Sequence, residues 1–337
     1  MPTIQDVARH AQVSVKTVSR VMNQHEHISQ KTREKVERAM QDLNYAPSAI
    51  ARQMRLGDNL SIGVLLADPS SGYQSQLNHS LLKACSKAHR YLAVELFDKE
   101  NSDWRGQVAQ FLDRSKVSNM VLVPPICDSM EIHAVLRERK VRFVLVSPSQ
   151  PVAGASAVAM DDRRAAREVT EHLISLGHRR IAHITGRDEH VVTVLRRLGY
   201  QDAIQAAGLA SVCDGLVVKG NFSFRQALDC AEDLLSRPDR PTAIFAANDH
   251  MAVAVMMTAH KMGLSVPEDL SVAGFDDTFM GRSIWPPLTT IAQPFDDISE
   301  MAVSLLSDQR RAPVNASEVH ILPHAMIVRG STGKAPA

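Results

Sequence analysis

The residues whose types and spacing are best suited to chemistry lie between positions 14 and 22. In a helix, this segment separates its apolar side chains from a mixed face that carries two cations. That face consists of Val15, Lys16, Thr17, Ser19 and Arg20. Lys16 and Arg20 can donate hydrogen bonds to phosphate oxygens or base edges, and the smaller side chains leave room for close approach. The pattern therefore favours a helix that enters the major groove of DNA.

The neighbouring residues predict how that helix is held. Apolar residues recur three and four positions apart in two short runs. They are Ile4, Val7, Ala8 and Ala11 in the first run, and Val18, Val21 and Met22 in the second. A tight turn at Gln12 and Val13 separates the runs, with Val13 expected to be buried, and the Ser14 hydroxyl can cap the second helix. Two short helices joined this way form a helix-turn-helix.

Two further segments follow. A third helix is expected after Ser29, its predicted N-cap, and is expected to stop at residues 44–47. Its apolar stripe is Val36, Met40 and Leu43. A fourth segment, residues 48–56, has Ile50 and Met54 on one face. A helix of about nine residues is marginal alone in water because nucleation is costly, so we expect this segment to fold only against a partner.

Charge is distributed unevenly along the 337 residues. Residues 1–57 hold nine Lys or Arg against five Asp or Glu, a net charge of +4, whereas the whole chain carries +1. The remaining 280 residues therefore carry −3. A basic N-terminal part on a mildly acidic remainder predicts a DNA footprint confined to the N-terminal part.

The cysteine spacing and the distribution of apolar residues indicate the cellular compartment that we expect for the protein. The four cysteines have no CxxC spacing, which is typical of reduced thiols in a cytoplasmic protein. The chain shows neither a basic and apolar leader nor an 18-residue apolar run, so we expect neither export nor a membrane span.

Enzyme signatures are missing from the sequence. It contains no GxGxxG, P-loop or GxSxG motif, and none of its fourteen histidines forms HExxH. His25 and His27 flank a predicted turn, where a solvated surface is the favoured interpretation over a metal site. No catalytic residue, metal or cofactor is predicted.

From Leu60 onward, predicted strands and helices alternate. The first series has strands at 60–67, 91–97, 119–123 and 141–146 and helices at 76–90, 104–114 and 130–139. After a crossing at 148–155, the second series has strands at 157–160, 181–185, 216–219, 243–246 and 271–274 and helices at 164–176, 191–207, 225–235 and 251–262. Such alternation predicts an α/β body of two doubly wound, parallel-sheet lobes. A ligand cleft is expected between them, at the carboxyl ends of the strands.

The order of these motifs resembles the lactose-repressor family of bacterial transcription regulators. The N-terminal matches are Asp6-Val7-Ala8, Val13-Ser14, residues 17–21 with Asn23, residues 32–36, Leu43-Asn44-Tyr45 with Pro47, and Ala51-Arg52. Further matches are residues 171–173, 176–182, 241–249, 266–269, 272–277, 287–290 and 329–332. The resemblance covers nearly the whole chain. It implies a helix-turn-helix head at 1–46, a hinge helix and linker at 47–58, and a periplasmic-binding-protein-like ligand-binding and dimerisation domain at 59–337.

The resemblance also implies a DNA-contacting set. It comprises Thr3, Ser14, Val15, Lys16, Thr17, Ser19, Arg20, Asn23, Tyr45, Ala51, Met54 and Arg55. Family members read base edges at the positions of Val15 and Lys16, and Arg20 is expected to reach a base or a phosphate. Met54 stands where the family inserts a leucine wedge between base pairs of the minor groove.

A second implied set binds a small molecule. Arg196, in the Arg-x-x-Gly-Tyr motif at 196–200, matches the family's ligand-binding arginine, although Arg197 is adjacent and stays an alternative. Asp276 resembles the family's aspartate that accepts from sugar hydroxyls. Asn248 is expected either to touch ligand or only to cap the helix that follows it.

Three more residues complete this set. Phe222 occupies the family's aromatic platform position, with core packing as the alternative, and Asp161 and Tyr73 are further candidates. The loops at 68–74 and 147–150 depart from the family pattern. Since both loops are expected to face the cleft, the effector cannot be assigned by analogy.

The leading hypothesis is a homodimeric, cytoplasmic repressor of carbohydrate-use genes. It would bind a palindromic double-stranded DNA operator and be switched by a small molecule, a sugar or glycoside. Because no leucine heptad follows Arg329, a dimer is expected rather than a tetramer. The alternatives are a regulator with a nucleobase-type or other non-sugar corepressor, a sugar-binding recognition protein without a regulatory role, and an enzyme on the same fold.

Overall fold

The computed structural model describes residues 2–22, 28–45, 60–98, 101–307 and 317–336. The chain divides into two compact units, Met1–Asn59, here called the head, and Leu60–Ala337, here called the body. Each is considered by itself. Within the described ranges, no helix is both long and apolar enough to cross a bilayer.

The head is a cluster of short helices around a small apolar core. Its described helices are α1 (Ile4–His10), α2 (Val15–Met22) and α3 (Gln30–Asp42). Each contributes a fully buried valine, namely Val7, Val18 and Val36. The three predicted helices are therefore confirmed, and Val13 is half-buried against the same core.

Local hydrogen bonds explain where these helices begin and end. The Ser14 hydroxyl accepts from the backbone N–H of Thr17 at 3.1 Å, and Ser29 accepts from Thr32 at 3.3 Å, which confirms both predicted N-caps. Gln12 and Asn44 adopt left-handed backbone conformations, with φ of 47° and 45°, and so end α1 and α3. The predicted fourth segment, 48–56, lies outside the described residues.

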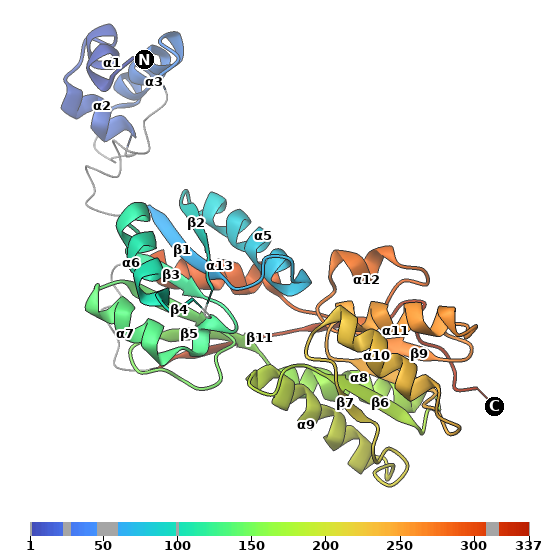
Figure 1. Ribbon diagram of the computed structural model, residues 1–337. Helices are drawn as coiled ribbons and strands as arrows, with labels where there is room; N and C mark the ends of the chain where they lie inside the picture. Colours follow the sequence, from blue (N-terminus) through green and yellow to red (C-terminus); the bar gives the residue numbers. More distant parts are fainter. Residues whose placement is uncertain (1, 23–27, 46–59, 99–100, 308–316, 337) are drawn as a thin grey trace. The chain divides into compact units, whose positions relative to one another are not determined.

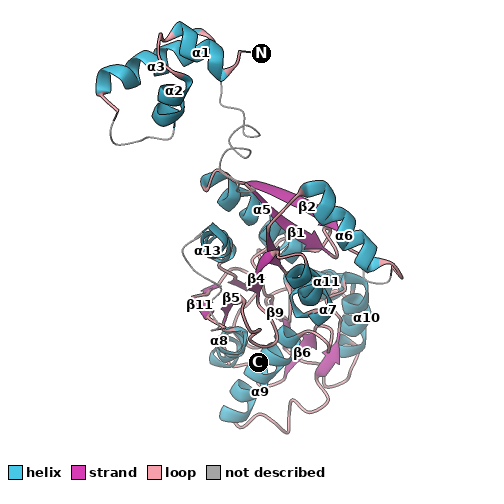
Figure 2. Cartoon of the chain, turned by 90° about the vertical axis from the view of Figure 1, so that its left-hand side faces the viewer, coloured by secondary structure: helices cyan, strands magenta, loops and turns pink. Residues whose placement is uncertain are grey.

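The first lobe of the body is built on a parallel sheet. Among the described residues it has six strands in the order β11-β5-β4-β3-β1-β2. They are β1 (Ser61–Leu66), β2 (Tyr91–Leu96), β3 (Asn119–Leu122), β4 (Arg142–Val146), β5 (Ser156–Met160) and β11 (Val319–Leu322). Helices α5 (Gly72–Lys87) and α13 (Phe295–Ser307) share one core cluster, and α6 (Trp104–Ser115) and α7 (Met130–Glu138) share another. The sheet is thus covered on both faces, as Figure 2 shows.

The second lobe repeats this plan with a smaller parallel sheet. Its described strands run in the order β7-β6-β8-β9. They are β6 (Ile181–Thr185), β7 (Val217–Lys219), β8 (Ala243–Ala246) and β9 (Ser271–Ala273). Its helices are α8 (Asp162–Ser175), α9 (Val191–Ala206), α10 (Phe224–Leu235), α11 (Asp249–Lys261) and the short α12 (Phe279–Ser283). An antiparallel pair, β10 (Thr290–Ala292) with β12 (Ala325–Ile327), completes it.

The chain passes between the lobes more than once, as the colours of Figure 1 show. It leaves the first lobe after β5, returns at α13 and β11, and enters the second lobe again at β12. The sequence placed the strand at 157–160 at the start of the second lobe. That placement is wrong, because β5 pairs with β4 and β11 in the first sheet.

Each sheet reverses its strand order at one point, between β1 and β3 in the first lobe and between β6 and β8 in the second. In open α/β sheets, ligands bind outside the carboxyl ends of the strands at such points. These ends therefore indicate where a binding site can form.

Candidate functional site

In the head, the structure separates α2 into a buried and an exposed side. Val18 and Val21 are buried in the core, whereas Val15, Lys16 and Arg20 are exposed. Val15 is notable because 41% of an apolar side chain faces solvent. An exposed apolar group beside two cations matches the mixture of methyl, base-edge and phosphate contacts that DNA offers.

The other head candidates also have structural tasks. Thr3 and Asp6 form a reciprocal capping box at the start of α1, and Ser14 shares a 2.9 Å hydrogen bond with the Thr17 hydroxyl. Ser19 is half-buried, and so is Tyr45, which packs on the head core. Four further candidates lie outside the described residues: Asn23, Ala51, Met54 and Arg55.

In the body, Arg196 on α9 is the centre of a buried polar cluster, and only 4% of it is exposed. Its Nε donates to Oδ1 of Asp162 at 2.8 Å, and its Nη1 donates to the carbonyl oxygen of Ala247 at 2.5 Å. The guanidinium lies over the ring of Phe275, with 3.7 Å from Cζ to the ring centroid. These contacts fix the position and plane of the guanidinium.

The neighbouring arginine is placed differently. Arg197 is half-buried, and its Nε has no hydrogen-bond partner among the described residues. Of the two arginines that the sequence left as alternatives, Arg196 is the one that contacts the cluster.

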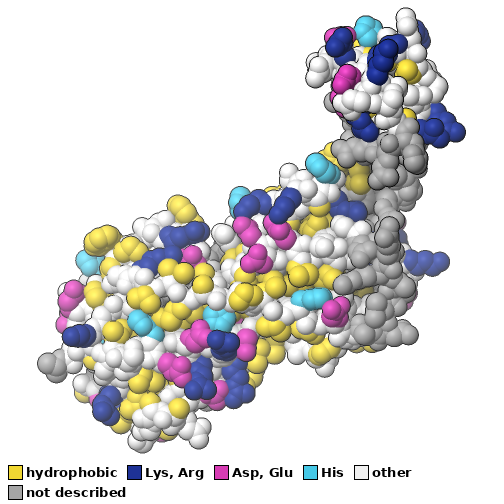
Figure 3. All heavy atoms as spheres, turned by 180° about the vertical axis from the view of Figure 1, so that it is seen from behind, with side chains coloured by type: hydrophobic (Ala, Val, Ile, Leu, Met, Phe, Trp, Pro, Cys, Tyr) yellow, Lys and Arg dark blue, Asp and Glu magenta, His cyan; other side chains and the backbone are white. Residues whose placement is uncertain are grey.

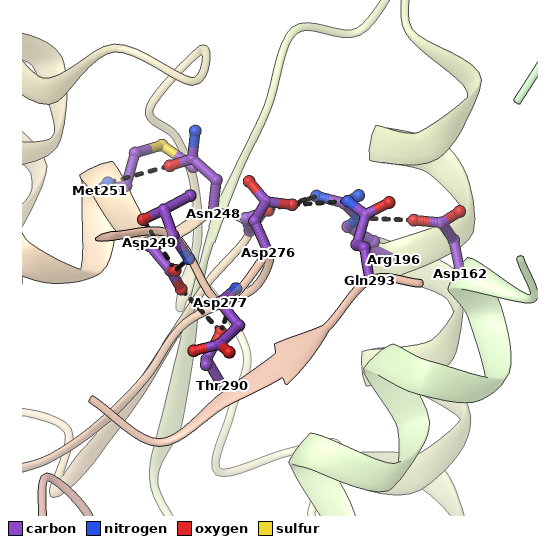
Figure 4. Close-up of polar contacts among 11 residues, drawn as sticks. Asp162, Arg196, Asn248, Asp249, Met251, Asp276, Asp277, Thr290 and Gln293 are labelled. Atoms are coloured by element: carbon purple, nitrogen blue, oxygen red, sulfur yellow. Dashed lines mark hydrogen bonds and ion pairs between the residues drawn. The ribbon is translucent and has the colours of Figure 1, made fainter. Parts of the chain in front are cut away.

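Asp276 follows β9 and lies next to this guanidinium. Its Oδ1 is 3.9 Å from Nη1 of Arg196 and accepts from Nε2 of Gln293 at 2.6 Å. Burial raises the pKa of Asp276 to about 8, although the charge of Arg196 opposes that rise. Figure 4 shows Arg196 between the carboxyl groups of Asp276 and Asp162.

A second buried carboxyl group supports the loop that carries Asp276. Asp249, at the start of α11, accepts from the backbone N–H and hydroxyl of Thr278 and from the hydroxyl of Thr290. Burial raises the pKa of Asp249 to about 6, and these hydrogen bonds work in the opposite direction. Asp277 is anchored by an ion pair with Arg329 at 2.7 Å. The loop after β9 is therefore held by contacts of both Asp249 and Asp277, and Figure 4 shows these two residues with Thr290.

Asp161 and Asp162 differ in exposure and in the groups that they contact. Asp161 is exposed, and its Oδ1 caps α8 by accepting from the backbone N–H of Arg164 at 2.9 Å. Asp162 is 3% exposed and holds Arg196. The sequence-based candidate and the residue in the cluster thus differ by one position.

Asn248 and Phe222 lie at the carboxyl ends of β8 and β7. The Asn248 side chain accepts from the backbone N–H of Met251 at 2.9 Å, so its predicted role as a helix cap is confirmed. The Phe222 ring is half-buried, stacks on His190 at 5.8 Å between centroids, and packs so closely on Gly186 that a Cβ there would lie 2.1 Å from it. Within the described residues, neither side chain forms a hydrogen bond or ring contact with Arg196 or Asp276.

Tyr73 approaches from the first lobe. Its ring meets Phe295 edge-on at 5.5 Å between centroids. Burial raises the pKa of its hydroxyl, and the charges of Asp276 and Asp162 in the second lobe raise it further. At the adjacent Gly72, a Cβ would lie 3.0 Å from Nε2 of His250 on α11. The buried cluster therefore lies where the two lobes meet.

Three cluster members had no assigned role from the sequence: Asp162, Asp249 and Gln293. Asp162 and Asp249 each follow a polar residue at the end of a strand, which is a detectable signal. Gln293 lies in the second crossing between the lobes, and its contact with Asp276 depends on that crossing.

A helix-turn-helix head with a two-lobed α/β body defines a class of ligand-responsive transcription regulator, and comparisons with known proteins agree. Residues 3–48 match the model described as bacterial regulatory proteins, lacI family. Residues 170–332 match the model of a periplasmic binding protein-like domain.

Individual relatives match most or nearly all of the chain. The ribose operon repressor of Escherichia coli (strain K12) is 35% identical, over 98% of this chain and 100% of the relative. The chain therefore belongs to the lacI family of bacterial regulatory proteins. The solved Lac repressor dimer bound to operator and the anti-inducer ONPF has a TM-score of 0.78 and 29% identity, covering 98% and 99% of the two chains. A family regulator from Enterococcus faecium with bound ribose has a TM-score of 0.70 and 25% identity, covering 81% and 98%.

Proposed function

We propose that this regulator is a homodimeric repressor that binds a palindromic operator and is switched by a sugar bound where the lobes meet. Its DNA-binding head would comprise residues 1–46, its hinge helix and linker 47–58, and its effector-binding and dimerisation domain 59–337. It would act in the cytoplasm and without catalysis.

One observation carries the proposal: the guanidinium of Arg196 and the carboxyl group of Asp276 are buried together at the junction of the lobes. Their separation of 3.9 Å is too long for a direct hydrogen bond. Each group therefore keeps hydrogen-bonding capacity that a ligand hydroxyl, which both donates and accepts, can satisfy. Ligand contacts to both lobes would favour one lobe arrangement over another.

The relatives support a sugar as the effector class. One is named for a ribose operon, and another has been solved with bound ribose. Tyr73, Asn248, Phe222 and Asp161 are proposed as flanking contacts. On the head, the exposed face of α2 supports operator recognition, because it carries Lys16 and Arg20 beside Val15.

The test begins with the full-length protein and a random pool of duplex DNA, from which operator sequences are selected. Operator affinity is then measured without effector and with ribose, glucose, cellobiose or adenine. We expect a palindromic site and a change in affinity with at least one sugar. A response to adenine alone would replace the sugar by a nucleobase-type effector. Failure to select any sequence would contradict the repressor itself.

A further inference from the structure

Carboxyl groups outnumber guanidinium groups around the buried Arg196. Asp162 and Asp276 lie on either side of its guanidinium, at 2.8 Å and 3.9 Å. Burial and the charges of Asp249 and Asp162 raise the pKa of Asp276, while Arg196 lowers it. Asp162 is therefore the closest acidic partner of Arg196, in a region shielded from water, where electrostatic effects are strong.

Several cations close to the cluster residues in sequence already have acidic partners. On the face of the body seen in Figure 3, basic side chains lie beside acidic ones. Such ion pairs include Arg163–Asp202, Arg164–Glu168 and Arg329–Asp277. The exposed Arg187 donates to the carbonyl oxygen of Asn221. These pairs offer little compensation to an anion that enters the cluster.

Asp162 also determines which donors of Arg196 are available. A carboxylate or phosphate is bound best by two parallel N–H groups of a guanidinium. One such pair includes Nε, which donates to Asp162, and the other includes Nη1, which donates to Ala247. Each pair therefore has one of its two nitrogen atoms already engaged, and the guanidinium is also fixed over Phe275. A hydroxyl group needs only one donor.

We propose that Asp162 is a positioning residue that sets effector specificity. By neutralising Arg196 and engaging its Nε, Asp162 makes the site selective for uncharged polyhydroxylated ligands and excludes phosphorylated or carboxylated sugars. This inference rests on the proposed function, since it refines the chemistry of the same site. Specificity here comes from an element that repels the wrong ligand as well as from contacts to the right one.

The experiment is calorimetric titration of the full-length protein with matched pairs, ribose against ribose 5-phosphate and glucose against glucose 6-phosphate. We expect the wild type to bind the free sugar at least about 100-fold more tightly than its phosphate. Asp162→Asn removes the charge but keeps an acceptor for Nε, and Asp162→Ala removes both. We expect the ratio of the affinity for the free sugar to the affinity for its phosphate to fall by at least about 10-fold in Asp162→Asn and further in Asp162→Ala. The fall should come mainly from tighter binding of the phosphate.

Asp202→Asn is the matched control. Asp202 pairs with Arg163 between the same two helices, α8 and α9, but at the surface. It should leave the ratio unchanged. If the role of Asp162 is purely structural, its substitution would weaken the binding of the sugar and of its phosphate equally. The ratio of the two affinities would then stay unchanged, which would overturn the inference.

The wild type alone can also overturn it, by binding a sugar phosphate as tightly as the free sugar. That result would leave the sugar-responsive repressor standing. If the wild type bound neither member of either pair, and none of the sugars tested for operator release, the proposed sugar effector would fail and this inference with it.

Discussion

Asp276 combines burial, an unusual backbone and a nearby cation in a single residue. Its φ of 114° lies in the left-handed region that favours glycine, and its N–H donates to the carbonyl oxygen of Ile291 at 2.8 Å. Such backbone geometry persists only where surrounding contacts impose it, and it is concentrated at functional sites. The contacts from Gln293 and Arg196 then define where the carboxyl group points.

Burial of Asp276 predicts how folding stability depends on pH. The pKa of Asp276 is about 8 in the folded protein, against an ordinary aspartate pKa of 3.8. Between these values the folded state binds a proton that the unfolded state has released. The contribution of this group to stability is therefore full below about pH 4 and is lost as pH rises towards about 8, with a slope of at most about 1.4 kcal/mol per pH unit.

We expect Asp276→Asn to reduce this slope between pH 5 and 8. Denaturant unfolding of the body at several pH values measures the effect. Asp296→Asn serves as control, since hydrogen bonds from Lys83 and Ser80 lower the pKa of this exposed carboxyl group. Equal slopes in wild type and Asp276→Asn would show that this carboxyl group is not protonated on folding.

At the scale of elements, α2 is proposed to read the operator. Substituting Val15 or Lys16 should change which operator is preferred, because both lie exposed at the start of α2. Loss of a good base-edge contact costs ~1–3 kcal/mol at one base position. The measurement is affinity for a set of operators that differ at single base pairs, with Lys31→Ala on α3 as a control for charge. Uniform weakening across all operators would identify Val15 and Lys16 as phosphate contacts instead.

The hinge segment supports a second prediction at this scale, although it lies outside the described residues. Methionine has an unbranched apolar side chain, and we propose that Met54 serves as the family's minor-groove wedge. Met54→Ala should greatly weaken operator binding and reduce the DNA bend without changing effector affinity. Amide exchange should show protection of residues 48–56 only when operator is present. Full protection in the free protein would contradict coupled folding.

Elements with strong local patterns were the most predictable. The strands β6 and β8 were predicted with their observed bounds, and the described helices from α1 to α11 were found with shifts at their ends. By contrast, α12, α13, β10, β11 and β12 were not predicted. The apolar spacing of α13 is visible in Phe295, Ile298, Ala302 and Leu306, but β10 and β12 are three-residue segments that pair only through a late return of the chain.

In the candidate site, too, residues in local motifs were easier to predict than residues whose contacts join distant parts of the sequence. Arg196 and Asp276 could be selected because their motifs are local. Asp162 could not, because its contact with Arg196 joins two helices, and the sequence offers two adjacent aspartates of equal type. Only the burial of one and the exposure of the other distinguish them. The assignment of β5 failed similarly, since a strand beside a lobe crossing can pair in either sheet.

At the scale of the whole molecule, the described residues include three crossings between the lobes, and the buried cluster lies where the two lobes meet. A ligand shifts an equilibrium only through its different affinity for two states. Contacts to Tyr73 in one lobe and Arg196 in the other supply such a difference if the lobe arrangement changes. The coupling between effector and operator is then expected to be ~1–3 kcal/mol, about 5–150-fold in DNA affinity.

The most direct test of this coupling is an operator titration of wild type and Asp276→Ala, each without effector and with a saturating sugar identified by calorimetry. We expect the wild type to change its operator affinity by about 5–150-fold. Asp276→Ala should bind operator as tightly as the effector-free wild type and show no response to the sugar. An unchanged response in Asp276→Ala would contradict the assignment of the effector site to the cluster of Arg196 and Asp276.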